Sequence, residues 1–70
     1  MSNKKNKKFR LLILSKYDSE AALARKLNWA KQKLNKMTNG IKLPNVQEVN
    51  ELSKALDVTT DTIIQIFLKV

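Results

Sequence analysis

The chain has 70 residues, a net charge of +8 at pH 7, and neither cysteine nor histidine. This length allows at most one domain with a modest core. The missing residue types exclude disulfides, thiol chemistry and histidine-based catalysis, so we expect no enzyme, no metal and no cofactor. No apolar run approaches the ~20 residues that span a bilayer, and no signal peptide is evident. We therefore expect no membrane contact and no small-molecule ligand.

The positive charge is concentrated in the first part of the chain. Residues 1–42 hold twelve Lys or Arg and two acids, a balance of +10, whereas residues 43–70 hold two Lys and four acids, a balance of −2. A high net charge also serves solubility, but solubility does not require one segment to hold nearly all of it. The asymmetry predicts a polyanion as the partner of the first part.

The first eight residues are polar and rich in lysine, which predicts a flexible basic arm (residues 1–8) before a folded domain (residues 9–70). The arm either follows nucleic-acid phosphates, with Lys8 and Arg10 as backbone contacts, or serves only as a solubility tail. A first helix is expected over about residues 9–16, because apolar residues recur there at helical spacing.

A second helix should begin after Asp18 or Ser19, both of which are good N-terminal caps. It should end at Asn28, because asparagine tolerates the left-handed conformation of a tight helix-ending turn. A third helix is expected over about residues 29–38. Gly40 should end it, since glycine takes positive φ without penalty.

A fourth helix should begin at Asn45, whose side chain can form a capping box with Glu48. Thr59 should cap a fifth helix that runs to about residue 68. The connections are short and no segment has the alternation of a strand. We therefore expect a compact all-α domain of five helices.

Residues 20–39 meet the requirements of a helix-turn-helix, which consists of two short helices joined by a tight turn. Ala24 is small where the two helices cross, and Asn28 accepts positive φ in the turn. Four apolar residues should clamp the helices together: Leu23, Leu27, Leu34 and Met37. Agreement at these fixed offsets indicates a DNA-binding unit.

Three segments are distinctive: Ser19-Glu-Ala-Ala-Leu-Ala-Arg-Lys-Leu-Asn, Asn39-Gly40 and Leu52-Ser-Lys-Ala-Leu-Asp-Val-Thr. Together they resemble the Cro/repressor (XRE-like) family of phage and bacterial transcriptional regulators, over about residues 9–68. The resemblance implies a five-helix, lambda-repressor-like domain whose second and third helices form the helix-turn-helix. It also implies a dimer on a pseudo-palindromic operator in double-stranded DNA, with the third helix in the major groove.

The resemblance carries the family's base-reading positions onto Lys31, Gln32 and Lys36. Their chemistry fits this role, because Gln pairs with adenine and Lys donates to guanine in the major groove. The family's second phosphate anchor matches Asn39 and Lys42. These five side chains are therefore the expected contacts of the third helix and the following loop.

Two further residues of the third helix, Lys33 and Asn35, are expected to contact either the phosphate backbone or nothing. Two departures from the family pattern stand out. Glu20 occupies a position where the family prefers Gln, and a carboxylate would repel phosphate. The family's Arg on helix 1 and Glu at the end of helix 3 align with Ile13 and Thr38, so both members of that ion pair are missing together.

The fifth helix contains more apolar residues than one face can bury against so small a core. This predicts a homodimer, at least on DNA, through Ile63, Ile66, Phe67 and Val70. The alternative is that the helix wraps the core completely.

Trp29 likewise has two interpretations, because its ring or indole N–H either contacts DNA or covers the end of the core.

These features predict a Cro-like or repressor-type transcriptional regulator of phage, prophage or plasmid origin, located in the bacterial cytoplasm on nucleoid DNA. Its mechanism would be occupancy of an operator. One alternative is an antitoxin or antirepressor that uses the fold as a scaffold for binding another protein. A second is non-specific binding of RNA or an anionic membrane through the basic arm.

Overall fold

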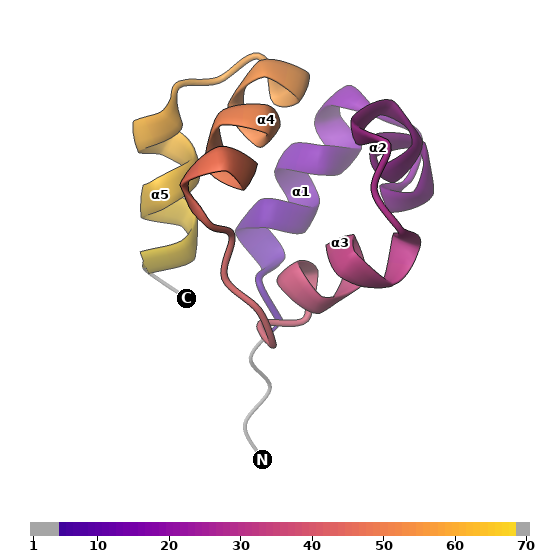
Figure 1. Ribbon diagram of the computed structural model, residues 1–70, viewed down its shortest axis with the longest axis horizontal. Helices are drawn as coiled ribbons and strands as arrows, with labels where there is room; N and C mark the ends of the chain where they lie inside the picture. The colour runs from indigo at the N-terminus through magenta and orange to yellow at the C-terminus, as the bar shows by residue number, and fades with distance from the viewer. Residues whose placement is uncertain (1–4, 69–70) are drawn as a thin grey trace.

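Five helices make up the computed structural model, which describes residues 5–68 (Figure 1). They are α1 (Lys7–Lys16), α2 (Glu20–Leu27), α3 (Lys31–Thr38), α4 (Val46–Leu56) and α5 (Thr60–Leu68). Within residues 5–68 there is no strand, so the predicted all-α class is confirmed. Over the same stretch, no helix is long and apolar enough to cross a membrane.

Side-chain caps begin four of the helices. Asn6, Ser19, Asn45 and Thr59 each accept a hydrogen bond from the backbone N–H three residues later. Such a cap stabilises a helix by about 1 kcal/mol. Three of the four caps, including the capping box of Asn45 with Glu48, were predicted from the sequence and are confirmed.

Left-handed residues end two of the helices. Asn28 after α2 has φ 61° and Asp57 after α4 has φ 58°, and Gly40 lies in the left-handed region after α3 with φ 75°. The conformations predicted for Asn28 and Gly40 are confirmed. Short side chains or glycine are needed at these positions, because larger residues clash in this region.

The start of α1 differs from the prediction. The helix begins at Lys7 because Asn6 caps it, and Asn6 itself is buried. The backbone N–H of Asn6 donates to the carbonyl of Thr38 at 2.7 Å, and its side-chain amide donates to the carbonyl of Ile66 at 3.3 Å. Residues 6–8 of the expected arm therefore belong to the folded domain, whereas residues 1–4 lie outside the described part of the chain.

The core is formed by residues from all five helices. Its members are Phe9, Ile13, Leu23, Ala24, Leu34, Met37, Val49, Leu52, Leu56, Ile63 and Phe67. The rings of Phe9 and Phe67 lie 4.8 Å apart between centroids, so the first and last helices meet in the interior. In Figure 1 α1 lies between α2 and α3 on one side and α4 and α5 on the other, and α3 packs most closely against α1 and α2.

The helix α5 buries two of the four residues that were expected at a dimer surface. Ile63 is fully buried and Phe67 is 9% exposed, so both belong to the core of this chain and are not available to a second copy. Residues 63 and 67 are one turn apart and share the inward face. The accessible apolar residues of α5 are instead Ile64, 41% exposed, and Leu68, 76% exposed. Ile66 is half-buried, and Val70 lies outside the described residues.

Candidate nucleic-acid interface

The helices α2 and α3 form a tightly joined pair. Ala24 is buried where they meet, and its carbonyl accepts hydrogen bonds from the backbone N–H groups of Asn28 and Trp29. The left-handed Asn28 then reverses the chain within three residues. Leu34 and Met37 fill the space between α3 and the core without any exposure. This is the helix-turn-helix geometry that residues 20–39 predicted, and it presents one face of α3 outward.

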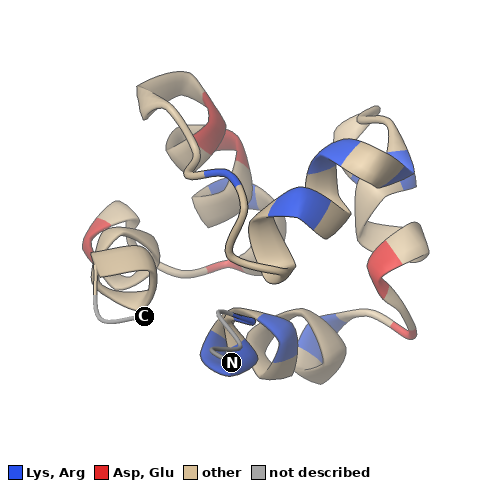
Figure 2. Cartoon of the chain, turned by 90° about the horizontal axis from the view of Figure 1, so that it is seen from below, with Lys and Arg blue, Asp and Glu red and all other residues tan. Residues whose placement is uncertain are grey.

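The expected base-reading side chains lie together on that outward face. Lys31, Gln32 and Lys36 are all exposed on α3, and Gln32 and Lys36 are one helical turn apart. Across residues 5–68, none of the three side chains has a hydrogen-bond or ion-pair partner. Figure 2 shows that Lys and Arg recur along α1 and α3. This arrangement leaves long donors free to meet a ligand in front of α3.

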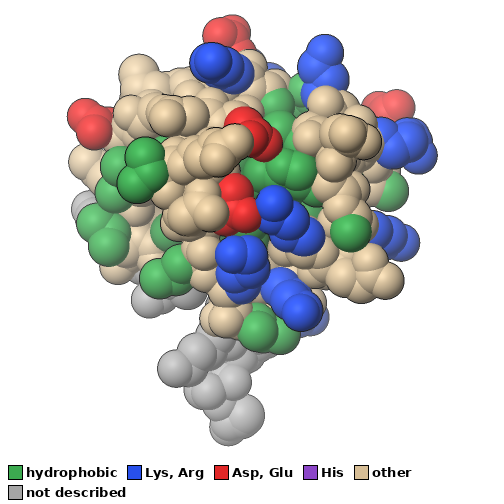
Figure 3. Space-filling model, in the orientation of Figure 1, with side chains coloured by type: hydrophobic (Ala, Val, Ile, Leu, Met, Phe, Trp, Pro, Cys, Tyr) green, Lys and Arg blue, Asp and Glu red, His purple; other side chains and the backbone are tan. Residues whose placement is uncertain are grey.

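Lys33 contacts other side chains of the protein, whereas it was expected to contact either the phosphate backbone or nothing. Its Nζ atom lies 2.8 Å from Oε2 of Glu48 and 4.3 Å from the centroid of the Trp29 ring. Lys42 lies on the other side of the same carboxylate, with Nζ 3.4 Å from Oε1 of Glu48. In Figure 3 basic side chains lie next to an acidic one on this face, over α3 and α4. The charges of these two lysines are thus partly compensated within the protein.

Glu48 remains ionised in this setting. Burial alone would raise the pKa of Glu48, but hydrogen bonds from Lys33 and from the backbone N–H of Asn45, together with the charges of Lys33 and Lys42, lower it below the ordinary value of 4.5. In the sequence, Glu48 is recognisable only as the capping-box partner of Asn45. Its partner Lys33 is fifteen residues away, so no local pattern could reveal the ion pair.

Trp29 is held by the protein itself. Its indole N–H donates to Oε1 of Glu51 at 2.9 Å, and its ring packs half-buried against the core. The structure therefore favours the interpretation that Trp29 covers the end of the core. Residues 29 and 30 precede the first turn of α3. This helix therefore begins at Lys31, two residues later than expected.

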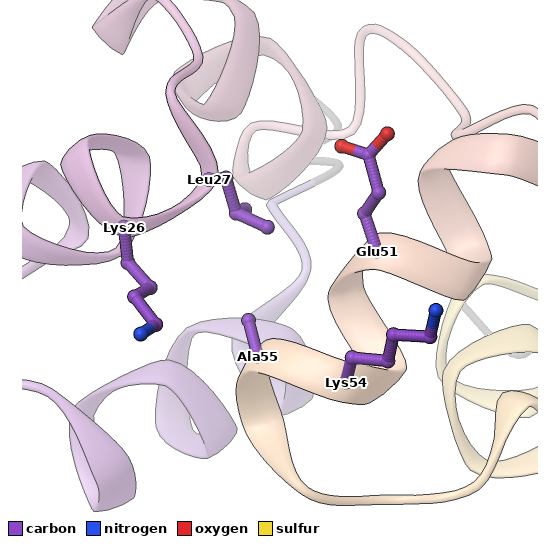
Figure 4. Close-up of a pocket in the computed structure, with 5 residues that line it drawn as sticks. All are labelled: Lys26, Leu27, Glu51, Lys54 and Ala55. Atoms are coloured by element: carbon purple, nitrogen blue, oxygen red, sulfur yellow. The ribbon is translucent and has the colours of Figure 1, made fainter.

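A shallow cleft lies between the end of α2 and α4. It is lined by Lys26, Leu27, Glu51, Lys54 and Ala55 (Figure 4). In this view Leu27 and Ala55 lie between the two elements, with the amines of Lys26 and Lys54 at either side. The described residues contain no group of three or more metal-ligating side chains. The cleft has no arrangement that would suggest chemistry.

A polar link replaces the family's missing ion pair. The Thr38 hydroxyl donates to Oε1 of Glu20 at 3.1 Å, and Nε of Arg10 lies 3.8 Å from Oε2 of the same carboxylate. Glu20 thus connects α1, α2 and α3. Its use inside the protein gives a physical reason for an acid at this position. The long contact to the exposed Arg10 adds little stability, so Arg10 remains available to a phosphate.

The remaining expected backbone contacts surround α3. Lys8 is exposed in the first turn of α1, and Asn39 is exposed just after α3. Asn35 is half-buried and lines a surface groove together with Arg10 and Lys31. Arg10 and Asn35 therefore lie beside Lys31, one of the expected base-reading residues.

Comparison with known proteins bears on this geometry. A family model described as helix-turn-helix matches residues 8–63. The matched stretch begins in α1 and extends into α5, so it covers well over half of the chain. No curated protein and no solved structure matches the chain.

Proposed function

The chain belongs to the Cro/repressor type of the helix-turn-helix family and is a DNA-binding regulator, and from this premise we propose that it is a sequence-specific repressor of phage, prophage or plasmid origin. Two copies bind a pseudo-palindromic operator, and α3 of each copy enters a major groove. The two grooves are about 34 Å apart, one helical turn of DNA. Occupancy of the operator then blocks polymerase.

The outward face of α3 is the observation that carries this proposal. Lys31, Gln32 and Lys36 are exposed there and have no partner within residues 5–68. In the major groove Gln can pair with N6 and N7 of adenine, and Lys can donate to O6 and N7 of guanine. Side chains of this length on the second helix of the motif fit direct reading of bases.

The phosphate contacts divide into two groups. Arg10 and Asn35 line one groove with Lys31, Asn39 is exposed after α3 and Lys8 is exposed on α1, and we assign these four residues to the DNA backbone. Lys33 and Lys42 were expected in the same role, but each shares the Glu48 carboxylate. We expect these two lysines to contribute less to backbone binding, because a phosphate must compete with that carboxylate.

The dimer is assigned to the exposed apolar residues of the α4–α5 side. These residues are Leu43, Val46, Ile64 and Leu68. A shallow groove between the segment before α4 and α5 joins Leu43 to Ile64 and Leu68. A second copy of the chain would remove this surface from water, and a two-fold operator would bring the copies together. We expect this dimer to form chiefly on DNA.

Selection of binding sites from random duplex DNA tests the proposal. The selected sequence is then titrated at several salt concentrations. A two-fold symmetric consensus with half-sites about one helical turn apart would support a dimeric operator-binding repressor. Recovery of no consensus, with only weak and salt-sensitive binding, would contradict it and would favour a scaffold for a protein partner.

A further inference from the structure

The carboxylate of Glu48 joins α4 to the DNA-reading helix α3. We infer that Glu48 is a positioning residue for DNA recognition: through Lys33 it holds α3 at a fixed orientation on α4 without touching DNA itself. This inference rests on the proposed function, since it concerns how the base-reading side chains are held. It assigns to a residue of α4 a role in sequence specificity.

The Glu48 carboxylate is itself rigidly placed. The side chain is 9% exposed, and Oε1 accepts a hydrogen bond from the backbone N–H of Asn45 at 2.9 Å. In return the backbone N–H of Glu48 donates to the Asn45 side chain at 2.8 Å. This capping box fixes the carboxylate relative to the first turn of α4. A partner bound to Oε2 is therefore fixed relative to the same turn.

Lys33 is that partner, and it is held on two sides. Its Nζ atom lies 2.8 Å from Oε2 of Glu48 and over the face of Trp29 at 4.3 Å. Trp29 is bound in turn to Glu51, which is one turn after Glu48 on α4. Consecutive turns of α4 thus hold Trp29, two residues before α3 begins, and Lys33, the third residue of α3. A charged hydrogen bond and a cation–π contact restrain a lysine more than either does alone.

This bridge spans a gap that the backbones leave open. No Cα atom of α3 lies within 8 Å of a Cα atom of α4, whereas α3 approaches both α1 and α2 more closely. Contacts between α3 and α4 are therefore made by side chains alone. A change in the bridge can tilt α3 without unfolding the core, because Leu34 and Met37 hold its inner face.

Two explanations of Glu48 predict opposite effects on binding. If Glu48 were only an acid near DNA, its neutralisation would strengthen binding to every duplex, because it would remove a repulsion of phosphate. If Glu48 positions α3, its neutralisation weakens binding to the operator and leaves random DNA unaffected or bound more tightly. The ratio of the two affinities separates these cases.

The variant Glu48→Gln makes this test, because its amide oxygen can still accept the hydrogen bond of the capping box. The matched control is Asp61→Asn, which makes the same charge change at an exposed site on α5. The dissociation constants for the selected operator and for a random duplex are measured at one salt concentration. We expect E48Q to lose about tenfold in operator affinity and D61N to keep the wild-type ratio. An unchanged ratio in E48Q would overturn the inference.

A second measurement follows the bridge directly. The side-chain protons of Lys33 lie over the Trp29 ring, so their NMR signals should be shifted upfield in the wild type and return towards ordinary values in E48Q. If E48Q does not fold, Lys33→Met removes the other end of the pair and should lower the same affinity ratio. A K33M protein with the wild-type ratio would overturn the inference, whereas a wild-type protein that selects no operator would overturn the proposed function first.

Discussion

The hydroxyl of Thr38, at the end of α3, donates to the carboxylate of Glu20 at the start of α2 over 3.1 Å. Thr38 is buried, and its hydroxyl also donates to the carbonyl of Asn35. The end of the recognition helix is thus tied to the start of its partner helix within the motif.

The substitution Thr38→Val keeps the shape of the side chain and removes the hydroxyl. We expect the free energy of unfolding to fall by about 1 kcal/mol, because a partly buried hydrogen bond is lost and Glu20 loses a donor. Urea unfolding measures the change. Thr60→Val is the control, since the Thr60 hydroxyl has no partner within residues 5–68. Equal losses in both variants would show that the Thr38 hydroxyl is unimportant.

Lys36→Ala tests direct reading of bases. Lys36 is exposed on α3 and free of partners within residues 5–68, so its removal should leave folding unchanged. We expect a loss of about 1–3 kcal/mol on the selected operator and little change on random DNA. The control is Lys54→Ala on α4, which removes the same charge away from α3. A loss of equal size on both DNAs would place Lys36 among the phosphate contacts instead.

The lowered pKa of Glu48 makes stability depend on acid pH. Its pKa in the folded protein is below the ordinary value of 4.5, so the ionised carboxylate stabilises the fold above that pH. This contribution is lost as the pH falls through the lowered pKa, because protonation breaks the pairing with Lys33 and Lys42. Unfolding by urea from pH 7 to pH 2 measures it. E48Q should lack this part of the acid dependence, and parallel curves for both proteins would contradict the assignment.

Ile64→Asp tests the assigned dimer surface. Ile64 is partly exposed on α5, so the variant should fold, while its charge would oppose contact between two apolar surfaces. We expect sedimentation on operator DNA to show mainly one bound copy where the wild type shows two. Ile63→Asp should unfold the chain, because it places a charge in the core. If two copies of I64D bind the operator with wild-type affinity, the assignment of α5 to the dimer interface is wrong.

The sequence predicted those parts of the fold that depend on neighbours along the chain. The caps at Ser19, Asn45 and Thr59 and the left-handed Asn28 follow from side chains within three or four residues, so local chemistry determines them. The apolar residues that hold the two helices of the motif together were also predictable, because helical periodicity places them on the inward faces: Leu23, Leu27, Leu34 and Met37. The cap that Asn6 forms with Phe9 is equally local and was missed, whereas the contacts of Asn6 with Thr38 and Ile66 could not be predicted because those residues are far away in sequence.

The candidate site was predicted less completely than the fold. The exposure of Lys31, Gln32 and Lys36 on α3 follows from helical periodicity. The pairing of Lys33 with Glu48 does not, because it depends on how α3 and α4 pack across a gap. The residues of α5 that face the core could also not be predicted. Five of the six residues from 63 to 68 are apolar, so helical periodicity does not show which of them point inward.

The contacts of Asn6 with Ile66 and of Phe9 with Phe67 have a consequence for synthesis of the protein on the ribosome. They join positions about sixty residues apart, so the core cannot close until α5 has left the ribosome. A nascent chain that ends before α5 leaves Phe9 without its ring partner and Asn6 without its acceptor at Ile66. The hydrophobic core is therefore completed only when translation has passed the last helix.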